Sequence, residues 1–372
     1  MYSQQELDDA VASGVITADA ANALRAHVEG LRATAIPDEE QFRLITGFND
    51  IFVSIAAAIL LFAVGWIGQS IGQSTGLFIS DHGEIGPSVF APLAIAATAW
   101  GLALFFTARR RMALPSILLL LAFVGGVLLT AGFGLVQIIG PDRTNDNVPL
   151  ETTIAGVSAA IAAAAAWLHW RRFRVPITVA AGAAAVAGLF VAVVVGIVQP
   201  QTSEAANNVI LPFVLVLGIG VFLFAMWWDS SDRGRLTRRS DVAFWLHLLA
   251  APMIVHPVFT LLGLNRGHIA LGEGAAAVAL YIVLGITALA VDRRALLVSA
   301  LAYVLFALNE LFRQFGAVEL NVALTALVIG SALLLLSAFW HQARSAIVKP
   351  LPESLRERLP LLDRTAITQQ AA

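Results

Sequence analysis

Charged residues gather in short clusters along this chain, and long apolar stretches lie between the clusters. Each stretch holds about 20 residues, which at 1.5 Å per residue matches the roughly 30 Å hydrocarbon core of a bilayer. The pattern therefore predicts an all-α fold, a polytopic bundle of ten membrane-spanning helices. The predicted spans are residues 51–72, 89–107, 115–139, 152–170, 176–198, 209–228, 242–263, 273–291, 295–315 and 320–340.

Basic residues follow every second predicted span, and this alternation orients the bundle. The basic clusters lie at residues 109–111, 171–174, 233–239, 293–294 and 344–349. Of the 23 basic residues, only Arg143, Arg266 and Arg313 fall on the opposite side. Because arginine and lysine are enriched in cytoplasmic loops, the pattern predicts that both termini lie in the cytoplasm. The expected location is a bacterial cytoplasmic membrane.

The polar segment before the first span, residues 1–48, is predicted to form a cytoplasmic helical hairpin and an interfacial helix. Ser3 opens a capping box, Gly14 suits the end of the first helix, and Thr17 suits the start of the second. Pro37, followed by acidic residues, favours the first turn of the interfacial helix.

The bundle is expected to cover residues 49–341, and a cytoplasmic tail to cover residues 342–372. Leucines in this tail alternate with arginines between Pro352 and Pro360. Two interpretations of the tail stay open, an amphipathic helix on the inner leaflet and a solvated segment without fixed structure.

Composition agrees with a membrane protein and excludes several functions. Hydrophobic residues make up 58% of the chain and charged residues 13%, with a mean hydropathy of +0.80. Soluble proteins carry roughly 25% charged residues. The net charge of −2 gives no field that would attract nucleic acid, and the absence of cysteine excludes disulfides and thiolate metal sites. No catalytic or nucleotide-binding motif is present, so we expect no cofactor and no bound metal, and a soluble type of enzyme is excluded.

Ionisable residues inside spans are costly and mark candidate sites. The seventh span holds His247 and His256, and the ninth holds Asn309, Glu310 and Arg313. His256, Asn309, Glu310 and Arg313 fall at a similar depth, which predicts a polar pocket open to the outer side, with His247 as a secondary candidate. The alternative is structural: each histidine bonds a neighbouring helix, and the glutamate and arginine form an interfacial ion pair.

The spacing of the basic clusters indicates an internal repeat, which has two interpretations. One is five tandem hairpins of the same orientation. The other is an inverted repeat of five plus five spans, as in many secondary transporters. The inverted repeat would require breaks in the first and sixth spans, near Gly65 and Gly68 and near Gly218 and Gly220.

The segment LDDAVASGVITADAANALRAHV, two helices joined by Gly-Val-Ile-Thr ahead of many spans, resembles the bacterial "predicted membrane protein" families of unknown function, of the domain-of-unknown-function 2157 type. The resemblance implies a bacterial cytoplasmic-membrane protein without an assigned activity, and it transfers no site residues.

Three functions follow as hypotheses. The leading one is a non-enzymatic membrane protein that acts through interaction, with the N-terminal hairpin as the docking module for a protein partner. The second is a secondary transporter, proton-coupled in one version, that uses His256 and Glu310. The third is a membrane-embedded enzyme acting on a lipid. We expect the chain to lie in a lipid bilayer and to bind no nucleic acid. The sequence leaves the substrate and the oligomeric state open.

Overall fold

The computed structural model describes residues 9–24, 48–81, 84–145, 147–235, 237–263, 271–294, 296–297, 301, 304–305, 308–309 and 321–362. The chain forms two compact units, one of Arg43–Pro360 and one that combines Met1–Phe42 with Leu361–Ala372.

In the unit that contains the N-terminus, residues 9–12 and 18–24 are helical. Gly14 follows the first helix with a φ of 70°, a left-handed conformation that glycine adopts without strain. The Thr17 hydroxyl accepts a hydrogen bond from the Ala20 backbone N–H at 3.2 Å, which caps the second helix. The roles predicted for Gly14 and Thr17 are thereby confirmed, whereas Ser3 and Pro37 lie outside the described residues.

As far as the structure describes it, the larger unit is a helical bundle with one small β-hairpin. Its elements are α3 (Phe48–Thr75), β1 (Phe78–Asp81), β2 (Glu84–Ser88), α4 (Phe90–Phe106), α5 (Ala113–Ile139), α6 (Pro141–Thr144), α7 (Val148–Phe173), α8 (Ile177–Val198), α9 (Ser203–Ser230), α10 (Arg238–Leu261), α11 (Leu271–Val291), α13 (Asn321–Ala338), α14 (Trp340–Val348) and α15 (Glu353–Arg356).

Many of these helices have the length and composition of membrane spans. Among the described residues, α3, α5, α7, α8, α9 and α10 are each long and apolar enough to cross a membrane. The pair formed by α13 and α14 passes the same criterion together, although it bends by 75° at its break, and α4 and part of α11 are shorter apolar helices. About two thirds of the predicted ninth span, residues 295–315, lies outside the described residues.

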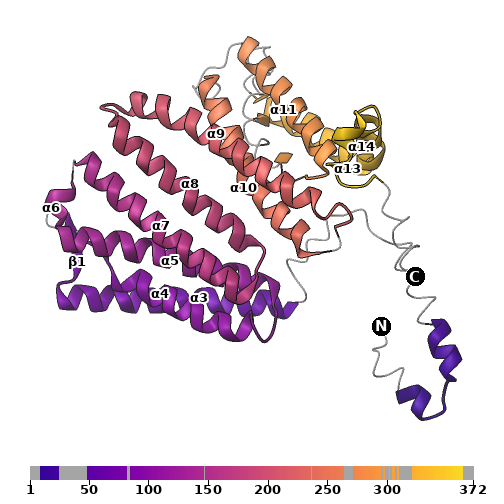
Figure 1. Ribbon diagram of the computed structural model, residues 1–372, viewed down its shortest axis with the longest axis horizontal. Helices are drawn as coiled ribbons and strands as arrows, with labels where there is room; N and C mark the ends of the chain where they lie inside the picture. Colours follow the sequence, from indigo (N-terminus) through magenta and orange to yellow (C-terminus); the bar gives the residue numbers. More distant parts are fainter. Residues whose placement is uncertain are drawn as a thin grey trace. The chain divides into compact units, whose positions relative to one another are not determined.

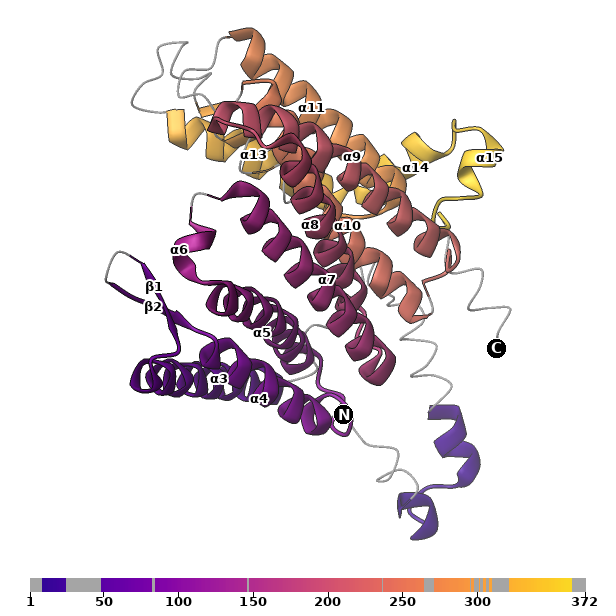
Figure 2. The same cartoon turned by 60° about the vertical axis from the view of Figure 1, so that its left-hand side comes forward.

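Helices that are neighbours in sequence are also neighbours in space (Figure 1). Helices α3, α4 and α5 pack against one another, α7 packs along α8, and α9 packs along α10, with α5–α7 and α8–α10 contacts between these groups. The view in Figure 2 shows the same succession, and α11 and α13 follow with α14. Neither α3 nor α9 is interrupted, so the breaks that an inverted repeat would require are not present in these two helices.

The connection between α3 and α4 forms the antiparallel hairpin β1–β2, which the sequence pattern did not predict. The Gln69 side chain of α3 holds this hairpin by donating to the Gly86 carbonyl at 2.9 Å and accepting from the Ser88 N–H at 2.8 Å. A side chain on Gly72 would overlap the Ser88 hydroxyl. The amide of Gln69 and the missing side chain of Gly72 therefore place the hairpin directly on α3.

Small residues fill the inside of the bundle, and large apolar residues cover its outside. Ala99, Ala162 and Ala251 are buried, whereas Trp66 is 69% exposed and Ile138 is 82% exposed. Soluble proteins rarely expose large contiguous apolar patches, while close packing of small residues is typical of helices in membranes. This distribution fits a multi-pass membrane protein.

Candidate functional site

The predicted outer pocket is only partly within the described chain. His256 lies on the exposed side of α10, and Asn309 is half-buried. Glu310 and Arg313 lie outside the described residues. The pocket of four residues therefore stays a prediction.

The secondary candidate, His247, lies in a buried ionic site that the sequence did not reveal. Its side chain is completely buried on α10, and its Nε2 lies 3.1 Å from Oδ2 of Asp229 in the last turn of α9. The ring of Phe222 packs edge-on against the imidazole, with 5.1 Å between the ring centroids. The histidine thus bonds a neighbouring helix, which is the structural alternative considered for it.

Asp229 is bound from a second side by Arg293, which follows α11. Arg293 donates through Nη2 to Oδ1 of Asp229 at 2.5 Å and through Nε to Oδ2 at 3.2 Å, a bidentate ion pair. The same Nη2 donates to the Ser240 carbonyl in the first turn of α10 at 3.0 Å. Both oxygens of Asp229 therefore have charged or polar partners, although the carboxylate is completely buried.

A second carboxylate, Asp292, lies beside the first site. Arg235, in the turn between α9 and α10, forms an ion pair with Oδ2 of Asp292 at 3.1 Å. The Trp340 indole N–H donates to Oδ1 at 2.8 Å, and Nε of Arg344 lies 3.8 Å from the same oxygen. Nη2 of Arg235 also donates to the Val291 and Asp292 carbonyls, so it satisfies acceptors at the C-terminus of α11.

We call this set the charge cluster and define it as Asp229, Arg235, His247, Asp292, Arg293 and Arg344. It joins the end of α9, the residues just after α11, His247 within α10 and Arg344 within α14. Buried charges are tolerated when they are paired and hydrogen-bonded, and this set meets that condition with carboxylates and backbone carbonyls. The cluster therefore fixes the relative positions of four helices.

The C-terminal segment is bound to the same region. Arg233 donates to the Leu359 carbonyl at 3.0 Å and to the Arg356 carbonyl at 3.0 Å, and Arg344 donates to the Pro360 carbonyl at 2.6 Å. The Leu359 side chain is buried in an apolar cluster with Val291. As far as Pro360, Arg233 and Arg344 thus bind the backbone of this segment, which contains the short helix α15.

A second buried histidine lies between α7 and α8. His169 is completely buried, and its Nδ1 lies 3.2 Å from the Thr178 hydroxyl. Aromatic rings of Trp100, Phe123 and Phe173 surround the imidazole at centroid distances of 4.6–6.1 Å. His169 is not among the residues predicted from the sequence, where it lies two residues before an arginine cluster and carries no signal for burial.

The described residues contain no group of three or more histidine, aspartate or glutamate side chains arranged as metal ligands. The contacts of the charge cluster are ion pairs and hydrogen bonds between its side chains.

These features define a class, a helical bundle whose apolar helices fit a multi-pass membrane protein and which contains a buried cluster of paired charges. No protein-family model, no curated protein sequence and no solved structure compared with the chain matches it.

Proposed function

We propose that this chain is a multi-pass protein of a bacterial cytoplasmic membrane that acts through interaction with other proteins rather than through catalysis. In this proposal it crosses the bilayer ten times and both termini are cytoplasmic. The basic turns support the orientation, since the arginines at 109–111, 171–174 and 233–239 each follow an even-numbered predicted span.

The observation that carries the proposal is that the charged groups of the charge cluster bind one another. Its carboxylates are bound by arginine and histidine side chains, and Nη2 of Arg235 and Nη2 of Arg344 bind backbone carbonyls, including one of the tail. A reaction site needs acid and base groups that converge on a space where a substrate can lie. Here the groups converge on one another, so the cluster is suited to maintaining a fixed cytoplasmic surface.

The N-terminal hairpin is the proposed docking module. It belongs to a unit distinct from the bundle, and its side chains Val15 and Leu24 are exposed. Exposed apolar residues on a small helical unit suit a contact with a protein partner. The resemblance to the bacterial membrane-protein families rests on this same segment.

Deletion of residues 1–36 tests this function. The shortened chain is expressed in a strain of the source bacterium that lacks the native gene. We expect it to insert into the membrane and to melt at the same temperature as the full chain. We also expect that it does not correct the defect of that strain. The full chain is the control. Restoration of the normal phenotype by the shortened chain would contradict the docking role of the hairpin.

A second candidate function is proton-linked transport, and one observation favours it. His247 and Asp229 form a completely buried ionisable pair on facing helices, and such pairs serve as proton relays in transporters. The two functions differ in what they require of the pair: transport needs groups that exchange a proton, whereas a structural pair can be replaced by a neutral one.

A further inference from the structure

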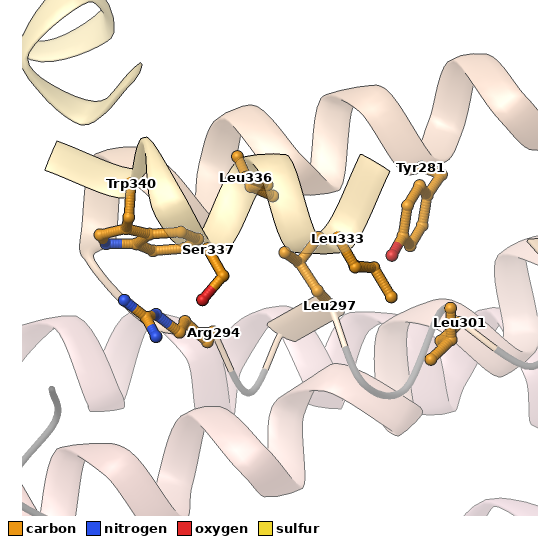
Figure 3. A pocket seen from close by; sticks show the side chains of 8 residues that line it. All are labelled: Tyr281, Arg294, Leu297, Leu301, Leu333, Leu336, Ser337 and Trp340. Carbon is orange, nitrogen blue, oxygen red and sulfur yellow. The ribbon is translucent and has the colours of Figure 1, made fainter. Parts of the chain in front are cut away.

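A cavity of about 160 Å³ lies between α11, α13, α14 and the residues that follow α11 (Figure 3). Leu297, Leu301, Leu333 and Leu336 form most of its wall. One water occupies roughly 10–15 Å³ on such a measure, so the space takes on the order of ten methylene-sized groups. Its apolar wall is suited to a hydrocarbon chain and disfavours a small polar solute.

The two ends of the cavity carry different polar groups. Figure 3 shows Arg294 and Ser337 at one end, under the Trp340 ring, and Tyr281 at the other. The Arg294 guanidinium lies 4.8 Å from the centroid of the Trp340 ring. Asp292 holds that ring through the indole N–H, so the cation is supported by a fixed aromatic surface.

Arg294 differs from the nearby arginines because its guanidinium pairs with no carboxylate among the described residues. Arg235, Arg293 and Arg344 face carboxylates, whereas the Arg294 guanidinium makes no ion pair or hydrogen bond with any residue that the structure describes. Its position at the mouth of an apolar cavity leaves it available to an anionic group whose other part is hydrocarbon.

We propose that this cavity binds an anionic phospholipid of the inner leaflet, with the phosphate on Arg294 and one acyl chain between Leu297, Leu333 and Leu336. Leu334 is 74% exposed and Leu335 is 59% exposed, and neither lines the cavity, so α13 also presents an apolar surface outside it. Basic pockets between membrane helices on the cytoplasmic side bind the head groups of anionic lipids. The inference depends on the proposed membrane orientation and is independent of the docking role of the hairpin.

The charge requirement is tested on the full chain in detergent by native mass spectrometry, titrated with phosphatidylglycerol and, separately, with phosphatidylcholine. We expect preferential binding of phosphatidylglycerol, and Arg294→Gln is expected to weaken it about tenfold, as removal of a hydrogen bond to a charged group does. Arg239→Gln is the matched control, because Arg239 is an exposed arginine on the same predicted face. Equal losses in the two variants, or equal affinity for the two lipids, would overturn the proposal.

The acyl-chain requirement is tested by filling the cavity. Leu333→Trp places a large ring among the wall residues and is expected to reduce phosphatidylglycerol binding, while Leu334→Trp on the exposed face of α13 leaves it unchanged. Melting temperatures of both variants identify any loss of fold, and Arg294→Gln, which leaves the wall leucines unchanged, then decides alone. Glycerol phosphate that binds as tightly as the lipid, or unchanged lipid binding in Leu333→Trp, would show that no acyl chain enters.

Discussion

Asp229 illustrates at the scale of one residue how a charge persists inside an apolar bundle. A buried carboxylate without partners is expensive, but here His247 and Arg293 together engage both oxygens. Such pairs contribute little net stability compared with apolar packing, but loss of one partner leaves an uncompensated charge. The pair therefore acts mainly to specify one arrangement of α9, α10 and the end of α11.

Replacement of Asp229 by a neutral residue is expected to destabilise the fold unless Arg293 is replaced as well. Asp229→Asn keeps an oxygen for His247 but leaves Arg293 buried without its carboxylate, which costs about 3–5 kcal/mol. Asp229→Asn combined with Arg293→Met removes both charges and should recover most of that loss. Thermal unfolding of the purified protein in detergent measures both effects.

The same double variant separates the two candidate functions. If the chain acts through interaction, the stable double variant restores the phenotype of the gene-deficient strain. If the chain transports protons through this pair, the double variant folds but does not function. Equal instability of the single and double variants would contradict the ion-pair account itself.

The histidine of this site could be selected from the sequence, but its partners could not. His247 stands out because an ionisable residue inside a span is costly. Asp229 and Arg293 lie at the ends of spans among other charges, where sequence alone indicates solvated residues. Their direction is set by the packing of α9, α10 and α11, which the hydropathy pattern does not encode.

At the scale of elements, close contact between two helices depends on individual glycines. On α9, a Cβ at Gly218 would lie 2.8 Å from Cβ of Met253 and 2.9 Å from its carbonyl carbon on α10. Gly220, two residues further on, has no neighbouring atom within 4 Å of the same position. Gly218 therefore allows α10 to approach α9 closely, whereas Gly220 is not part of this contact.

Alanine substitutions at these two positions should therefore have opposite effects. Gly218→Ala is expected to destabilise the bundle by about 1–3 kcal/mol, since the backbone of α10 must move. Gly220→Ala is expected to be neutral or to stabilise by up to about 1 kcal/mol, because alanine favours a helix. The two variants are compared by thermal unfolding in detergent, and a greater loss at Gly220 would contradict the packing of α9 on α10.

Helix positions were predictable from the sequence because hydropathy and capping residues agree. The spans predicted at 115–139 and 176–198 correspond to α5 and α8, and Thr202 caps α9 as its residue type favours. The hairpin β1–β2 and the bend between α13 and α14 were not predicted. Both depend on tertiary contacts, such as the bonds from Gln69 to β2, for which local sequence carries no periodic signal.

At the scale of the whole molecule, a membrane accounts for two distributions at once. Large apolar side chains lie on the outside of the bundle, which is unfavourable in water and favourable in lipid. Basic residues gather at alternate turns, as expected when those turns lie on the cytoplasmic side of a membrane. Sequence could predict both distributions because each depends on residue type along the chain rather than on particular contacts.

The orientation of the ten proposed spans is tested most directly by cysteine accessibility, because the chain has no cysteine of its own. Single cysteines are introduced at Ser74, Gln201, Ser231 and Ala346, and intact cells are treated with a membrane-impermeant maleimide. The proposed topology predicts labelling at residues 74 and 201 in intact cells, and at residues 231 and 346 only after the membrane is permeabilised. Labelling of residues 231 and 346 from opposite sides of the membrane would contradict it.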